Sequence, residues 1–275
     1  APLGEDYLSV LRQGLDPGNG WIDVYPHRDK DSGAFSASVF GLHPYVKMNY
    51  FNDVDDMSTL AHEFGHALHS HLSMNNQPYV TASYSMFNAE IASTFNEKLL
   101  SDYLIENAKS DAERLYLLNE LVETIRTTIY RQTLFAEFEW LIHTAAEKGT
   151  PLTAEFFAKT YESLIRSYYG EHFTLGKDDG MEWAYIPHFY YKYYVFTYAT
   201  GLSSGIALAQ RVLSEGEQAR NAYLGMLKGG SSKPPLDLLR DAGVDLSKPD
   251  AIAGAAKLLD DTLAKMEKIL AAQKK

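Results

Sequence analysis

Histidine and glutamate at close spacing form the pattern in this chain that points most clearly to chemistry. The run His62-Glu63-Phe64-Gly65-His66 has the spacing H-E-x-x-H. On a helix this spacing places two imidazoles one turn apart on one face, where both can bind one zinc ion. The carboxylate between them then lies beside the metal-bound water. The pattern is the signature of a zinc peptidase and predicts metal-assisted hydrolysis.

The motif needs a helix to position it. Apolar residues recur at near-helical spacing from Asp55 to about Ser73, which predicts a helix over this range. Gly65 is the one interior residue that disfavours a helix, at a cost of about 1 kcal/mol relative to Ala. We expect it to permit the close approach of a neighbouring backbone or of the substrate.

Two more histidines lie on the same predicted helix. His69 follows His62 by seven residues, which is about 10.5 Å along the axis and too far for both to join one ion with His66. We expect His69 to pack against or support the site. His71 lies on the opposite side of the helix from His62, and we expect it in solvent or near a loop.

A catalytic zinc takes three protein ligands and leaves one position for water, so a third ligand must come from another element. Pro78 interrupts the helix, and a second helix is predicted from about Tyr84 to Asn107. In an antiparallel helix pair, Glu90 lies about two turns after the bend and His66 about two turns before it, so the two are level. Glu97 lies two turns further along, past the level of the motif. Glu90 is therefore the predicted third ligand.

Strand-like segments precede the motif. Residues 21–25, 34–40 and 45–51 are rich in aromatic and β-branched residues and are separated by turn residues, which predicts a small sheet over about residues 20–51. Gly33, Ala34 and Ser36 are small enough to let an extended peptide pair with an exposed sheet edge. We predict that Gly33 and Ala34 contact the substrate; an ordinary hairpin is the alternative.

The rest of the chain has helical patterns separated by glycine-containing loops. The predicted helices are about Asp111 to Lys148, Thr153 to Tyr169, Tyr190 to Leu213, Gly216 to Leu227, Pro235 to Ala242 and Pro249 to Ala272. One of them begins in a tyrosine-rich run, since six of the 19 tyrosines fall between Tyr185 and Tyr198. Such a density of phenols suits a wet cleft, because a buried phenol needs a polar partner. Helical spacing would place Tyr191, Tyr194 and Tyr198 on one face; a buried tyrosine-rich helix is the alternative.

Composition limits the class of protein. The chain has 275 residues, 45% of them hydrophobic, and a formal net charge of -11. We predict one domain over residues 1–275. The acidic balance argues against a nucleic-acid partner, and no apolar run is long enough to predict a membrane partner. The absence of cysteine fits a reducing compartment, and we expect a cytoplasmic location.

Several segments match one family in order along the chain. They are Gly20 to Tyr25, Ser32 to Ser36, His43 to Val46, the motif helix, Gln77 to Tyr79, Ala89 to Glu97 and Ile186 to Tyr194. The chain resembles the oligoendopeptidase F branch of the thimet-oligopeptidase-like zinc metallopeptidases. The resemblance implies a mainly α, multi-helix zincin-type metallopeptidase lobe with a small β-sheet near its N-terminus. It also implies cleavage of internal bonds in short peptides, with Glu90 as the glutamate ligand by motif position.

The resemblance further implies a histidine and tyrosines that stabilise the transition state opposite the zinc. These map onto His188 and Tyr198, with Tyr191 and Tyr194 as substrate-binding residues. A register shifted by one residue places Thr197 where Tyr198 stands. We favour the register that keeps a phenol at this position.

The expected mechanism is attack by a zinc-activated water, with one zinc ion held by His62, His66 and Glu90 and with Glu63 as the general base. Family members carry a long helical region ahead of the portion seen here, and we expect this chain to lack it. Two alternatives remain open: a related zinc carboxypeptidase, and an inactive peptide-binding fragment.

Overall fold

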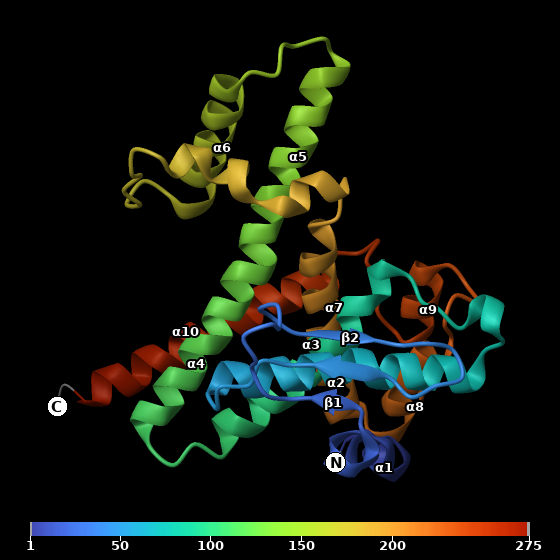
Figure 1. Ribbon diagram of the computed structural model, residues 1–275. Helices are drawn as coiled ribbons and strands as arrows, with labels where there is room; N and C mark the ends of the chain where they lie inside the picture. The colour runs from blue at the N-terminus through green and yellow to red at the C-terminus, as the bar shows by residue number, and fades with distance from the viewer. Residues whose placement is uncertain (1, 274–275) are drawn as a thin grey trace. The chain divides into compact units, whose positions relative to one another are not determined.

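Helices dominate the computed structural model, which describes residues 2–273 (Figure 1). The described helices are α1 (Gly4–Leu15), α2 (Val54–Asn76), α3 (Met86–Glu106), α4 (Asp111–Ile125), α5 (Arg131–Glu147), α6 (Ala154–Tyr169), α7 (Phe196–Glu215), α8 (Glu217–Lys228), α9 (Pro235–Asp241) and α10 (Asp250–Gln273). The strands are β1 (Ile22–Asp23), β2 (Phe35–Ala37) and β3 (Tyr45–Lys47). The predicted mainly α class with a small sheet near the N-terminus is confirmed. None of the described helices is both long and apolar enough to cross a membrane.

The chain divides into two compact units. The first contains residues up to Val122 and those from Gly201 onward, and the second contains Glu123–Thr200. Each unit has a buried apolar cluster of its own. The prediction of a single domain over residues 1–275 stays a prediction.

Among residues 2–273, no strand pairs with the outer edge of β2. The strand order is β1-β3-β2, with β1 parallel and β2 antiparallel to β3. Val46 donates its N–H to the carbonyl of Trp21 at 2.7 Å, so its polar backbone groups face β1. Backbone groups alternate along a strand, so the residues paired with Lys47 and Tyr45 face β3, and Ser36 between them points its N–H and C=O to the free edge.

The strands are shorter than predicted because side chains donate hydrogen bonds to the backbone carbonyl groups that precede β2. Asn49 donates its amide to the carbonyls of Asp31 and Gly33, each at 2.9 Å. The ammonium group of Lys47 reaches the same segment. These carbonyls therefore have partners outside a strand ladder, and β2 begins only at Phe35.

Helix α2 carries the motif and packs against α3. A capping box formed by Asp53 and Asp56 starts α2, and the helix ends at Asn76, two residues before Pro78. A Cβ atom on Gly65 would lie 2.5 Å from the Cα of Ser93, so only glycine allows this approach of the two helices. The expected close approach is therefore to a neighbouring backbone.

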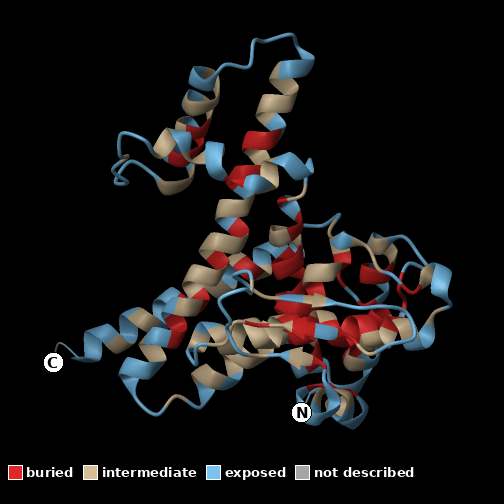
Figure 2. Cartoon of the chain, viewed as in Figure 1, coloured by how far each residue is buried: buried red, intermediate tan, exposed pale blue. Residues whose placement is uncertain are grey.

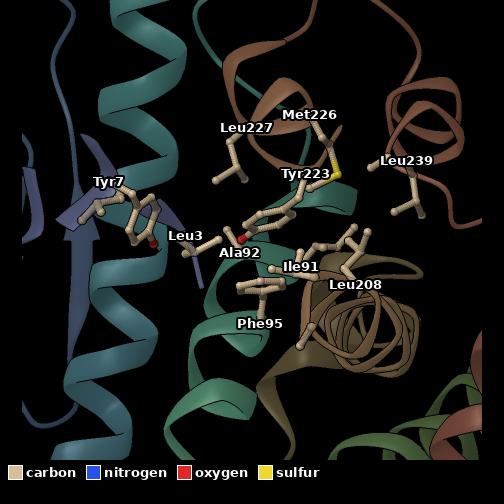
Figure 3. Packing of buried hydrophobic residues seen from close by; sticks show 14 of the residues in the cluster. Leu3, Tyr7, Ile91, Ala92, Phe95, Leu208, Tyr223, Met226, Leu227 and Leu239 are labelled. Carbon is tan, nitrogen blue, oxygen red and sulfur yellow. The ribbon is translucent and has the colours of Figure 1, made fainter. Parts of the chain in front are cut away.

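The first unit is built around the α2 and α3 pair. In Figure 2 the buried residues of this unit concentrate along these helices and α7. Figure 3 shows Tyr223 of α8 lying flat on Phe95 of α3, with the ring centroids 3.9 Å apart. Apolar residues of α1, α7 and α9 complete the cluster, so helices from both ends of the chain support the motif.

The second unit has an aromatic core, and the helix predicted from Tyr190 to Leu213 begins later than predicted. Phe138 of α5 packs edge-on against Tyr161 of α6, with the ring centroids 5.2 Å apart. The helix predicted from Tyr190 begins only at Phe196. Lys192 and Tyr193 adopt positive φ angles of 48° and 51°, which no α-helix allows. Tyr191 and Tyr194 therefore do not share a helical face with Tyr198.

Candidate metal centre

Three side chains from α2 and α3 converge on one point. The Nε2 atoms of His62 and His66 lie 3.1 Å apart, and the Oε2 atom of Glu90 lies 3.4 Å and 3.6 Å from them. Among the described residues, these three are the group of potential metal ligands found together, with ligand atoms all within 4.8 Å of one another. The predicted antiparallel arrangement brings Glu90 level with the two histidines.

The orientation of the His62 ring is fixed by Glu97, a contact that the sequence did not predict. Glu97 lies about two turns after Glu90 on α3. It accepts a hydrogen bond from Nδ1 of His62. In the neutral ring this contact holds the proton on Nδ1, so Nε2 is the nitrogen whose lone pair faces the other candidate ligands. His66 also has a hydrogen bond to the backbone of Ala89. Metal-binding histidines typically have such a partner on the far nitrogen.

The two histidines titrate in opposite directions. Burial lowers the pKa of His62, but the hydrogen bond and charge of Glu97, together with Glu90 and Glu63, outweigh it and raise the pKa to about 9. Burial and the neighbouring His62 lower the pKa of His66, so its imidazole stays neutral. The neutral form is the one that binds metal.

Glu63 is a buried carboxylate at the edge of the sheet. Its side chain is 6% exposed, and burial raises the pKa of the carboxyl group. It accepts a hydrogen bond from the backbone of Ser36, which lies on the free edge of β2. The second oxygen, Oε2, has no hydrogen-bond partner among the described residues. A basic oxygen is thus kept available where an extended peptide would pair with the sheet.

The donor set fits a divalent metal ion. Two imidazole nitrogens and one carboxylate oxygen are the ligands of a catalytic site of the zinc type, which keeps a further position open. Next to His62 in the sequence, Glu63 has a buried carboxylate oxygen without a hydrogen-bond partner among the described residues.

The other two histidines of α2 lie away from the ligands, as predicted. His69 is buried and stacks flat on Tyr84, with the ring centroids 3.6 Å apart, and burial lowers its pKa to about 3. It therefore packs as a neutral ring beside the site. His71 is half-buried against Trp21, with the ring centroids 5.7 Å apart, so it lies near a loop rather than in open solvent.

The predicted substrate-binding residues Gly33 and Ala34 lie immediately before β2. Gly33 has φ of +78°, a conformation that favours glycine, and its carbonyl is taken up by Asn49. Ala34 precedes Phe35, so backbone alternation places its polar groups on the same free edge as those of Ser36. Their contact with a substrate stays a prediction.

His188 and the tyrosines form a ring cluster within the second unit. The Oη atom of Tyr198 lies 3.4 Å from Nε2 of His188. The ring of Tyr194 stacks on His188 at 5.9 Å, and Tyr191 lies edge-on to both. The four side chains therefore meet although they do not share a helix. Their roles in catalysis and substrate binding stay predictions.

The loop that carries this cluster depends on a second residue that the sequence prediction missed. Glu139 of α5 is 1% exposed and accepts a hydrogen bond from the backbone N–H of Tyr193. Lys192 and Tyr193 form the positive-φ segment just before α7. A buried carboxylate thus stabilises a backbone conformation that non-glycine residues disfavour. The pattern of the sequence contains no signal for it, because Glu139 lies 54 residues away.

Relatives are found over nearly the whole chain. "Oligopeptidase PepF" of Bacillus subtilis is 47% identical over 270 residues, which cover 98% of this chain and 40% of that protein. Among solved structures, a putative peptidase from Chlamydophila abortus has a TM-score of 0.87 at 41% identity, covering 98% of this chain and 45% of the other. Oligoendopeptidase-F from Enterococcus faecium has a TM-score of 0.74 at 33% identity, covering 98% and 42%. The chain spans less than half the length of each of these proteins.

The family follows from a match that includes the metal centre and both units. The model of peptidase family M3 matches residues 5–258, a range that contains the H-E-x-x-H helix, Glu90, and the ring cluster around His188. The resemblance noted from separate sequence segments is thereby confirmed. The chain belongs to peptidase family M3.

Proposed function

We propose that this chain is the catalytic portion of a zinc-dependent endopeptidase that cleaves internal bonds of short peptides. The observation that carries the proposal is the convergence of His62, His66 and Glu90 beside a buried Glu63 at an unpaired strand edge. The oligopeptidase names of the relatives support the substrate class. The same proposal extends to the whole protein: we propose that it cleaves short peptides and that it is located in the cytoplasm.

The proposed chemistry divides between the metal and the chain. Zinc held by His62, His66 and Glu90 would supply Lewis-acid activation, lowering the pKa of a bound water from about 15.7 toward 7. Glu63 takes the proton of the attacking water on its free oxygen and later delivers it to the leaving amine. The free edge of β2 holds the peptide extended through backbone hydrogen bonds.

We propose that the side chains of His188 and Tyr198 donate hydrogen bonds to the carbonyl oxygen of the cleaved bond. This oxygen becomes negatively charged in the transition state. Both side chains carry an N–H or O–H group, and they lie within 3.4 Å of each other. Loss of one such donor typically costs about 2.7 to 4 kcal/mol of transition-state stabilisation. We therefore expect Tyr198→Phe to lower kcat about 100-fold or more, whereas Tyr193→Phe, in the loop that precedes α7, should change it little. Equal effects of the two substitutions would argue against this role of Tyr198.

The base assignment is tested by Glu63→Gln. The amide keeps the shape of the side chain but cannot accept the proton, so hydrolysis of an internally quenched peptide should fall by about 10² to 10⁴. Zinc content, measured by elemental analysis, should be unchanged. Glu106→Gln, at the exposed end of α3, is the matched control and should retain both activity and zinc. Full activity of the Glu63 variant would refute the assignment.

The metal and the mode of cleavage need separate measurements. Dialysis against a chelator should abolish hydrolysis, and added zinc should restore it; activity that survives complete metal removal would refute the metal role. Mass spectrometry of the products should show cuts at internal bonds. Stepwise loss of single residues from the carboxyl terminus would indicate a carboxypeptidase instead.

A further inference from the structure

A pocket lined by apolar side chains and serine hydroxyls opens at the end of β2, beyond the candidate metal centre. It has a volume of about 640 Å³. One wall is the loop that follows β2, the other is the connection between α2 and α3, and α2 forms the floor. Its main lining residues are Val39, Phe40, Ser70, Met74, Tyr79 and Val80. All of them belong to the unit that holds the metal ligands.

The two walls of the pocket present apolar side chains that could contact an apolar group. Tyr79 and Val80 are 75% and 79% exposed, so their apolar surface has no cover from the described residues. Phe40 packs edge-on against Tyr79, with the ring centroids 5.4 Å apart, and joins the two walls at the rim. The floor hydroxyl of Ser70 already bonds to Tyr84 at 2.8 Å. No charged residue is part of the described lining, so burial of an apolar group there leaves no ion unpaired.

The pocket continues directly from the proposed catalytic residues. Ser70 follows Glu63 by seven residues, about 10.5 Å along the axis of α2. Strand β2 runs in the same direction as α2 between Glu63 and Ser70. Ser36 of β2 contacts Glu63, and the loop after β2 reaches Ser70. An extended peptide advances about 3.4 Å per residue, so the pocket lies about three residues from the position of the base.

We propose that this pocket binds a large apolar side chain, such as Phe, Leu or Met, about three residues from the bond that is cleaved. Antiparallel pairing is the more stable arrangement at a strand edge. A peptide antiparallel to β2 has its amino-terminal part toward the end of β2, where the pocket lies. The preferred side chain is therefore on the amino-terminal side of the cleaved bond. This inference rests on the proposed function.

The test uses peptides that differ at one position. Two matched series carry Phe, Ala or Lys three residues before or three residues after the cleaved bond. Phe should exceed Ala in kcat/KM by about tenfold in the first series and not in the second. Val80→Asp should remove the preference for Phe and make Lys the favoured residue, because it places a carboxylate at the rim.

A control and a binding measurement separate this proposal from the proposed function. Ile252→Asp, an exposed apolar residue of α10, should leave the preference for Phe unchanged. Binding of the same peptides to the zinc-loaded Glu63→Gln protein, followed by fluorescence anisotropy, reports on the pocket even if no peptide is cleaved. The inference is overturned if Val80→Asp keeps the preference for Phe, if the preference lies after the bond, or if Val80→Asp weakens all peptides equally because another part of the protein covers the pocket.

Discussion

At the scale of single residues, the contact between Glu97 and His62 shows how a candidate ligand is oriented for metal binding. Glu97 occupies Nδ1, so the proton of the neutral ring is held there and Nε2 faces Glu90 and His66. The geometry fixes both the tautomer and the orientation of the ring.

We expect Glu97→Gln to weaken zinc binding by about 10- to 100-fold without removing a ligand. The amide accepts the same proton but lacks the negative charge that makes the imidazole more basic. Competition with a chromogenic chelator measures the affinity, with Glu106→Gln as the control. An affinity equal to that of the unsubstituted protein would show that Glu97 has no part in tuning the site.

The convergence of the three candidate ligands was predictable from the sequence, but the residues that support them were not. The spacing of His62 and His66 gives one face of a helix directly, and counting turns on both sides of Pro78 selects Glu90. Glu97 was excluded as a ligand by the same count, yet the count could not show that its side chain reaches back to His62. The contact of Ser36 with Glu63 joins a strand to a helix, and no local pattern encodes such a pairing.

At the scale of elements, glycine sets the distance between the helices that carry the ligands. A Cβ on Gly65 would lie 2.6 Å from the carbonyl oxygen of Ala92, and one on Gly201 of α7 would lie 2.8 Å from the Cβ of Glu90. Helix α3 is thus in close contact with α2 on one side and with α7 on the other.

Gly65→Ala should destabilise the protein by about 1–3 kcal/mol, because the added methyl group forces α2 and α3 apart. Gly254→Ala is the matched control. It lies within α10 with no atom near its added Cβ, so it should stabilise the protein by up to about 1 kcal/mol. Urea unfolding measures both free energies. If Gly65→Ala also stabilised the protein, the close approach would not limit the helix spacing.

The tyrosine-rich run shows where element prediction fails. Residues 190–198 contain neither Gly nor Pro, so their pattern favours a helix. The observed break at Lys192 and Tyr193 depends on Glu139, whose carboxylate accepts the Tyr193 N–H from another helix. A tertiary contact has overridden the local preference.

At the scale of the molecule, two separate apolar clusters stabilise the two units. Phe95 is fully buried in the first cluster and Phe138 is buried in the second. Their locations suggest that a cavity in one cluster acts first on its own unit.

Phe138→Ala should therefore speed amide hydrogen exchange in α5 and α6 while leaving α2 and α3 protected. Phe95→Ala should do the reverse, and each substitution should cost about 3–5 kcal/mol in its own unit. Hydrogen-exchange mass spectrometry resolves the two regions. Uniform acceleration in both variants would show instead that the chain unfolds as one cooperative domain.

The unpaired edge of β2 has a consequence for the abundance of the protein. The folded chain offers this edge, and an unfolded chain does not, so any peptide that pairs there draws the folding equilibrium toward the native state. On the proposed function, a peptide at 100 times its Kd would add about 2.7 kcal/mol to the free energy of unfolding. The supply of short peptides would then set how long each copy survives, and a shortage of substrate would mark the protein for turnover.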